Sequence, residues 1–162
     1  MNIRNATVAD IPEIMRICDS ARNYMRANGN KAQWINGYPS KQLWLDDIAK
    51  KQCFVCEEKN HLCAVFAFII GEDPTYLYIE NGQWKNDLPY GTIHRLGSDG
   101  TCSGIMEKCK AFALSHVSEL RADTHEDNKI MQAVLERNGF ERCGIIYIED
   151  GSPRIAYQFS RK

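Results

Sequence analysis

The sequence predicts a single α/β domain of the mixed α+β kind, in which helices flank one sheet. Segments with apolar residues at helical spacing alternate with short runs rich in Val, Phe and Ile, which is typical of a sheet covered by helices. A chain of 162 residues with 44% hydrophobic content is long enough for one core and contains no internal repeat or linker. We therefore expect one domain over residues 1–162.

Helices are predicted where apolar residues recur at the spacing of one helix face. Thr7 and Asp10 form a capping pattern before the first such segment, and Asn28-Gly29 follows its end. Ser40 caps a shorter second segment, and Asn138-Gly139 ends the last one. The predicted helices cover residues 11–27, a short segment after Ser40, residues 104–117 and residues 128–137.

Strands are predicted where short apolar runs lie between turn residues. The predicted strands cover residues 3–6, 53–57, 62–71, 76–79, 92–98, 120–124, 143–149 and 154–159. Residues 33–39 are expected to form a loop. The polar segment over 80–90, which contains Trp84 and Tyr90, is expected to form an exposed loop.

Charge and composition exclude several classes of partner. Twenty basic and 21 acidic side chains give a net charge of -1 with the signs interspersed, so we expect no nucleic-acid partner. The amino terminus lacks the apolar core of a signal peptide, and the longest apolar run, over 63–70, is too short to cross a bilayer. We expect a cytoplasmic protein with no membrane partner.

The sequence contains seven cysteines, an odd number, and Cys53 and Cys56 have CxxC spacing. No second CxxC follows, and the pair lies on a predicted strand. The pattern therefore favours reduced thiols that pack as small hydrophobes over a metal or redox site.

The segment over 93–106 runs from a predicted strand through a glycine-punctuated loop into a helix. Such a turn directs unpaired backbone N–H groups and the positive end of the helix to one place, which suits a pyrophosphate. A tight turn that merely requires glycine is the alternative.

A second segment, Asp123 to Asn128, begins another helix and is followed by Gly139-Phe140. Together with 93–106 and the segment from Gln33-Trp34 to Pro39, it resembles the GNAT-type N-acetyltransferases, in particular a bacterial subgroup. The resemblance spans nearly the full chain. It implies a mostly antiparallel sheet of about six to seven strands, about four helices, and acetyl-CoA as co-substrate with no metal.

The resemblance also implies which residues bind the cofactor. The family's loop pattern falls on Thr101, Gly104 and Met106, of which only Gly104 matches. Main-chain groups of Leu96 and Ser98 would pair with the pantetheine arm, and the Leu96 N–H would polarise the thioester carbonyl. The implied cofactor-binding residues are Leu96, Ser98, Thr101, Cys102, Ser103, Gly104, Ile105, Met106 and Asn128.

Acetyl transfer to an amine requires a base, because an ammonium group must first lose a proton. His94 is the predicted base: it lies two residues before Leu96, as a histidine of some family members does, and an unperturbed imidazole titrates near neutral pH. A packing histidine is the alternative. The position of the tyrosine that acts as general acid in the family falls on Leu135 here. Tyr147 is therefore the predicted general acid, the alternative being an aromatic residue that only packs on the sheet.

Three further predictions concern polar residues near the implied site. Gln33 and Trp34 would lie near the acceptor amine, the alternative being an anchor without a role in specificity. Asn128 is expected to cap its helix, to contact the cofactor arm, or both. The run His125 to Asp127 favours a solvated turn over a metal site, because three consecutive side chains cannot all converge.

The sequence thus favours an enzyme that transfers an acetyl group to a primary amine, of a small molecule or a peptide, by direct attack in a ternary complex. A degenerate acyl-CoA-binding sensor or assembly module is the first alternative, given Thr101, Met106 and Leu135. An interaction domain using Trp84 and Tyr90 is the second. The resemblance leaves a homodimer open.

Overall fold

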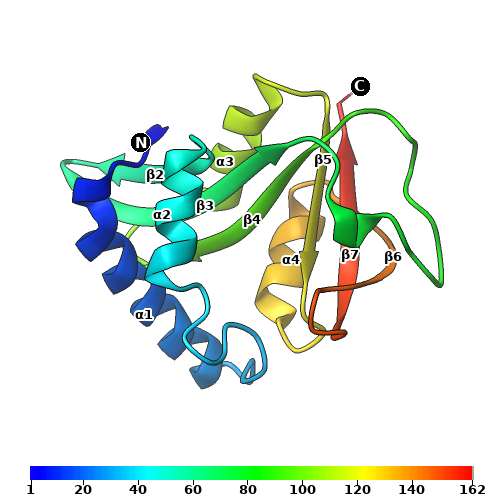
Figure 1. Ribbon diagram of the computed structural model, residues 1–162, viewed down its shortest axis with the longest axis horizontal. Helices are drawn as coiled ribbons and strands as arrows, with labels where there is room; N and C mark the ends of the chain where they lie inside the picture. The colour runs from blue at the N-terminus through cyan, green and yellow to red at the C-terminus, as the bar shows by residue number, and fades with distance from the viewer. Residues whose placement is uncertain (162) are drawn as a thin grey trace.

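The computed structural model describes residues 1–161, which form one seven-stranded sheet with four α-helices around it (Figure 1). The strands are β1 (Asn2–Asn5), β2 (Cys53–Glu58), β3 (His61–Ile70), β4 (Gly91–Ser98), β5 (Glu119–Thr124), β6 (Glu141–Tyr147) and β7 (Pro153–Ser160). The helices are α1 (Ile11–Ala27), α2 (Lys41–Ala49), α3 (Ile105–Leu114) and α4 (Lys129–Arg137), with short 3-10 turns η1 (Val8–Asp10) and η2 (Pro74–Tyr76). The strand order is β1-β2-β3-β4-β5-β7-β6. Only the β4–β5 pair is parallel, which confirms the predicted mixed, mostly antiparallel sheet.

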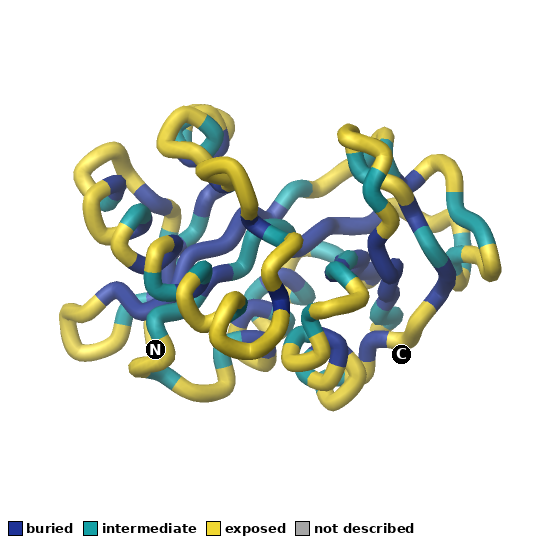
Figure 2. The backbone as a smooth tube through the Cα atoms, turned by 90° about the horizontal axis from the view of Figure 1, so that it is seen from below, coloured by how far each residue is buried: buried dark blue, intermediate teal, exposed yellow. Residues whose placement is uncertain are grey.

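Helices cover both faces of this sheet. In Figure 1, α1 and α2 lie in front of the strands and α3 and α4 lie behind them. Ile14 and Trp44 belong to a core cluster that packs α1 and α2 on β2 and β3, whereas Met106 and Leu135 belong to a second cluster that packs α3 and α4 on the other face. Figure 2 shows the buried residues concentrated in the central strands, with the outer turns of the helices exposed.

The predicted strand over 76–79 is wrong. Asp73 instead caps η2 by accepting a hydrogen bond from the N–H of Thr75 at 2.9 Å, and Pro74 begins the turn. Tyr76 is only 2% exposed, because its ring packs in a small third cluster with Tyr90 and with residues of β6 and β7. The aromatic character of this segment therefore reflects the burial of one ring, that of Tyr76, and not a pleated strand.

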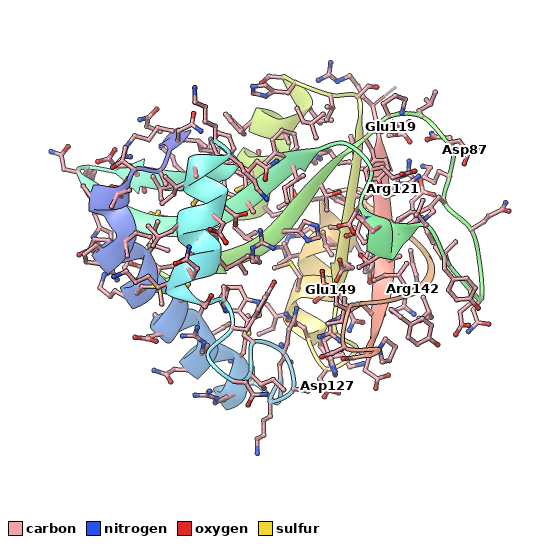
Figure 3. The ribbon with its side chains drawn as sticks, in the orientation of Figure 1. Asp87, Glu119, Arg121, Asp127, Arg142 and Glu149 are labelled. Carbon is pink, nitrogen blue, oxygen red and sulfur yellow. The ribbon has the colours of Figure 1, made fainter. Side chains whose placement is uncertain are left out.

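The loop over 80–90 is mostly irregular, as predicted, but its aromatic residues are not free surface. The guanidinium of Arg121 on β5 lies between two rings, 4.0 Å from the ring centre of Trp84 and 3.9 Å from that of Tyr90. Asn86 also donates a hydrogen bond to Glu119 at 2.6 Å. Figure 3 shows Glu119 and Arg121 together beneath this loop. The prediction of an exposed aromatic loop, on which the alternative of an interaction domain rests, is thus wrong for Tyr90, which is buried.

A bulge in β4 separates β4 from β5. The register with β3 shifts between Val65 and Ala67, and Arg95 at this point has a left-handed φ of 54°. Its guanidinium donates to Asp47 of α2 at 2.7 Å, which stabilises the bulged conformation. β4 and β5 consequently pair only at Gly91 with Leu120 and at Thr92 with Arg121, and they diverge beyond these residues.

Candidate active site

A cavity of about 790 Å³ lies where β4 and β5 have diverged. It is lined by the end of β4, the start of α3, much of α4 and the C-terminal end of α1. Its apolar lining includes Met25, Leu96, Ile105, Ile130 and Met131. A cavity of this size can hold a ligand as large as a nucleotide cofactor.

Most of the predicted cofactor-binding residues meet at this cavity. Those that line it are Leu96, Ser98, Gly104, Ile105, Met106 and Asn128. Thr101, Cys102 and Ser103 lie in the loop that leads to α3, outside the lining. The structure therefore brings the strand, the helix start and the helix cap together, but it leaves the middle of the loop at the margin.

Gly104 is the N-cap of α3 and has φ 67° and ψ 27°, the left-handed conformation that glycine adopts without a Cβ penalty. No side chain caps the first turn of α3, so its N–H groups remain available at the cavity wall. Unpaired N–H groups and the positive end of a helix favour an anionic group such as a phosphate.

Charged residues that the sequence reading did not single out also line the cavity. Lys110 on α3 and Lys129 and Arg137 on α4 are basic, whereas Glu107 and Asp127 are acidic. Figure 3 shows Asp127 at the end where α4 begins. The basic excess, together with the start of α3, fits a ligand that carries phosphates at one end and apolar groups along its length.

Asp99 anchors the loop that leads to α3. Its Oδ1 accepts hydrogen bonds from the N–H and the hydroxyl of Thr101, at 2.9 and 2.6 Å. Its Oδ2 lies 2.8 Å from Nε2 of His61 on β3 and 3.1 Å from Nη1 of Arg16 on α1. Burial alone would raise the pKa of this carboxyl, but the hydrogen bonds from Thr101, His61 and Arg16 outweigh burial and lower the pKa to about 2.

We expect this anchor to stabilise the folded protein above pH 4 and to fail in acid. The folded-state pKa of Asp99 lies below its ordinary value of 3.8, so its contribution is complete above that value and is lost as the pH falls toward about 2. Urea unfolding at several pH values checks this for wild type and Asp99→Asn. The difference in unfolding free energy between the two should shrink between about pH 4 and pH 2, and a constant difference would contradict the prediction.

Two residues that depart from the family's pattern lie in the core. Met106 is 5% exposed and packs in the cluster beneath α3, so its bulk is directed mainly into the core. Leu135 is 1% exposed in the same cluster. The position where the family has a tyrosine therefore serves packing in this chain.

Gln33 and Trp34 connect the loop after α1 to the cavity residues. Oε1 of Gln33 accepts hydrogen bonds from Nδ2 of Asn128 and from Nδ2 of Asn30, both at 3.1 Å. Asn128 also caps α4, since its Oδ1 accepts from the N–H of Met131 at 3.0 Å. Trp34 is 6% exposed and packs against β4, where a Cβ at Gly97 would lie 2.9 Å from its ring. Trp34 thus anchors the loop on the sheet.

His94 lies on β4 beside the point of divergence, outside the lining of the cavity. Its Nε2 is 2.9 Å from Oδ2 of Asp73. The Tyr76 ring lies 6.0 Å from the His94 ring, and the Tyr76 hydroxyl donates to Asp123 of β5 at 2.6 Å. Burial, followed by the charge of Asp123, raises the pKa of Tyr76 well above its ordinary value, so this hydroxyl keeps its proton.

Asp73 and Tyr76 were not singled out from the sequence. One signal could have found Asp73, because Asp-x-Thr occurs at 73–75 and again at 99–101. In both cases the first aspartate oxygen accepts from the threonine and the second faces a histidine. The pattern predicts each turn, but it does not identify the histidine that faces it, because His94 lies on β4 and His61 on β3.

Tyr147 lies outside the cavity lining and is 37% exposed, with its hydroxyl donating a short hydrogen bond to Glu80. In the turn before α4, the N–H of Asp127 donates to Nδ1 of His125 at 3.0 Å. Across residues 1–161, no three His, Cys, Asp or Glu side chains gather as a metal site. All seven cysteines are free, and all but Cys102 are buried.

Within the described part of the chain, no helix combines the length and apolar character needed to cross a membrane. No protein-family model and no curated protein matches the sequence. Solved structures do match. A GNAT-family acetyltransferase from Streptococcus agalactiae has 30% identity and a TM-score of 0.90, over 99% of this chain and 95% of its own.

Two more distant structures share the fold. A putative acetyltransferase from Staphylococcus aureus has 20% identity and a TM-score of 0.69, over 100% of both chains. A GNAT-family acetyltransferase from Listeria monocytogenes has 17% identity and a TM-score of 0.71, over 98% of this chain and 94% of its own.

The diverging strands, the cavity beside the free part of β4 and the likeness to the Streptococcus agalactiae acetyltransferase define an acyltransferase. The chain belongs to the GNAT family of acetyltransferases.

Proposed function

We propose that this protein is an N-acetyltransferase that transfers an acetyl group from acetyl-CoA to a primary amine by direct attack in a ternary complex. The observation that supports this best is the position of the cavity. It runs from the start of α3, which suits phosphates, along Leu96 to Ser98 on the part of β4 that has left β5, and His94 lies two residues before Leu96 on the same strand.

The residues of the cavity fit acetyl-CoA. Gly104 and Ile105 would hold the pyrophosphate through main-chain N–H groups, with Lys129 and Arg137 supplying charge. Leu96 and Ser98 lie on the part of β4 that has left β5, so their main-chain groups can hold the amides of the pantetheine arm. When bound, acetyl-CoA supplies the thioester whose carbonyl carbon the amine attacks.

His94 would accept the proton of the acceptor ammonium, so that a neutral amine reaches the acetyl group. No enzyme nucleophile is required. Cys102 has a half-buried thiol in the loop before α3, outside the cavity lining, which is a poor position for a covalent intermediate.

The role of Tyr147 as proton donor to the departing thiolate stays a prediction, because Tyr147 lies outside the cavity lining. Its hydrogen bond to Glu80 raises the pKa of Tyr147, so the phenol is protonated at neutral pH as an acid must be. If it donates, Tyr147→Phe should lower turnover with acetyl-CoA affinity unchanged. An unchanged turnover number would remove Tyr147 from the mechanism.

A panel of primary amines tests the proposal. Calorimetry with acetyl-CoA measures binding, and release of free CoA thiol in the presence of spermidine, an aminoglycoside or a peptide with a free amino terminus measures transfer. We expect binding, and thiol release that depends on one class of amine. Binding without transfer to any amine would favour the acyl-CoA-binding sensor. Absence of binding would remove both hypotheses.

A further inference from the structure

The hydrogen bond between Asp73 and His94 decides which nitrogen of His94 can act on a substrate. We propose that Asp73 is a positioning residue that keeps the proton of neutral His94 on Nε2 and thereby leaves Nδ1 as the atom that accepts the proton of the amine. The inference rests on the proposed acetyl transfer for its role in catalysis. The tautomer itself can be tested in the free protein.

The environment of Asp73 fixes the direction of this hydrogen bond. Oδ1 of Asp73 accepts from the N–H of Thr75 at 2.9 Å and from its hydroxyl at 2.7 Å, and Oδ2 lies 2.9 Å from Nε2 of His94. Burial alone would raise the pKa of Asp73, but the hydrogen bonds from His94 and Thr75 outweigh it and lower the pKa to about 2. The carboxylate is therefore ionised near neutral pH and can only accept, so Nε2 of His94 must carry a hydrogen.

The rest of the surroundings hold the pair in place and leave Nδ1 free. The N–H of Asp73 donates to the Tyr90 hydroxyl at 2.8 Å, and the Tyr76 ring lies beside the imidazole at 6.0 Å. Within residues 1–161, no hydrogen-bond partner of Nδ1 is present. An imidazole with one nitrogen fixed by a carboxylate and the other unpaired is arranged to act as a base through the unpaired atom.

The charged groups near His94 are consistent with this role. Asp123 on β5 is linked to His94 through Tyr76, whose hydroxyl donates to Asp123 and whose ring lies 6.0 Å from the imidazole. The neighbouring cation, Arg95, is already paired with Asp47 of α2. Asp73 is thus the charged group in direct contact with the ring.

The proton transfer balances without a further reactant. An N–H bond of the acceptor ammonium breaks and an Nδ1–H bond forms, so that a neutral amine and an imidazolium are produced. The positive charge on the ring then lies against the Asp73 carboxylate, which favours the transfer. The nitrogen of the neutral amine then forms a C–N bond with the thioester carbon, and the C–S bond breaks with its electron pair leaving on the thiolate. The second proton that the nitrogen loses as the amide forms neutralises this thiolate, so the products are the amide and the CoA thiol.

Asp73→Asn tests the inference because it preserves the shape of the turn. The amide oxygen can keep both hydrogen bonds from Thr75, and the amide nitrogen then faces Nε2 of His94 and donates to it. Nε2 must accept, so the ring proton moves to Nδ1 and the base is blocked. An analogous substitution in Ser-His-Asp triads acts through the wrong tautomer in the same way.

Long-range ¹H–¹⁵N spectra of the imidazoles, assigned with His94→Gln, report the tautomer without any substrate. We expect the Nε2–H tautomer in wild type and the Nδ1–H tautomer in Asp73→Asn. Asp99→Asn is the matched control: it removes the same type of carboxylate from His61 and should leave the signals of His94 unchanged. An Nδ1–H tautomer in wild type overturns the inference even if the variant does not fold.

Turnover provides the second readout. With the best amine of the panel, Asp73→Asn should lower the turnover number about 10²–10⁴-fold, as loss of a general base does, while acetyl-CoA affinity stays the same. A wild-type rate with a switched tautomer would overturn the catalytic role of Nδ1. If wild type releases no thiol in the presence of any amine of the panel, the proposed function fails, while the spectra still decide the tautomer assignment.

Discussion

His94→Ala is expected to lower the turnover number about 10²–10⁴-fold, because the acceptor ammonium loses the group that takes its proton. The remaining rate reflects what the substitution leaves intact: the polarisation of the thioester by the main chain of β4 and the juxtaposition of two bound substrates. Affinity for acetyl-CoA should stay the same, since His94 does not line the cavity.

The pH dependence separates a base from a packing residue. At saturating acetyl-CoA the wild-type rate should rise with pH through one ionisation, and His94→Ala should flatten this rise. His116→Ala is a suitable control, because His116 is an exposed histidine beyond the end of α3 that does not line the cavity. A His94→Ala enzyme with full rate and an unchanged pH profile would show that His94 only packs against Asp73 and Tyr76.

Gly104→Glu is expected to weaken acetyl-CoA binding by at least about 100-fold, which corresponds to about 2.7 kcal/mol. The new side chain would start at the N-cap of α3, at the wall where the phosphates are proposed to bind. Its negative charge would repel them and occupy the positive end of the helix. A φ of 67° adds strain for any residue with a Cβ.

Gly100→Glu is the matched control for the charge and for the strain. Gly100 lies in the same loop, has a left-handed φ of 82°, and has open space where a Cβ would be, but it does not line the cavity. Calorimetric titration with acetyl-CoA should therefore show a large loss for Gly104→Glu and a small one for Gly100→Glu. Equal losses would mean that loop conformation, rather than the phosphate position, sets the affinity.

Local patterns in the sequence determined most of the elements. The caps at Ser40 and Asn128 and the stops at Asn28-Gly29 and Asn138-Gly139 lie at helix ends in the structure, because caps and left-handed glycines act within one turn of the chain. The strand, loop and helix over 93–106 were likewise predictable. The resemblance to the GNAT family then identified which of these elements would line a cofactor cavity, and six of the residues it implied do so.

Patterns failed where a residue's environment comes from a distant segment. The aromatic run at 76–79 resembled a strand, but Tyr76 is buried against Tyr90 and held by Asp123, and neither contact is visible in the local spacing. Tyr90, expected on an exposed loop, is buried and packs against Arg121 of β5. In each case burial against a remote partner outweighed the local propensity.

Apart from the segment over 76–79, the sequence by itself thus determined the order of the helices and strands, together with the glycine that begins α3 and the histidine on the strand next to it, because these depend on spacing and on backbone conformation. Only the tertiary structure decided that β4 leaves β5 after Thr92 and that Asp73 faces His94. The bulge at Arg95 is stabilised by Asp47 from α2, and Asp73 lies 21 residues from His94 along the chain. Such pairs form when the sheet assembles, so the atom of His94 that can accept a proton is a property of the fold.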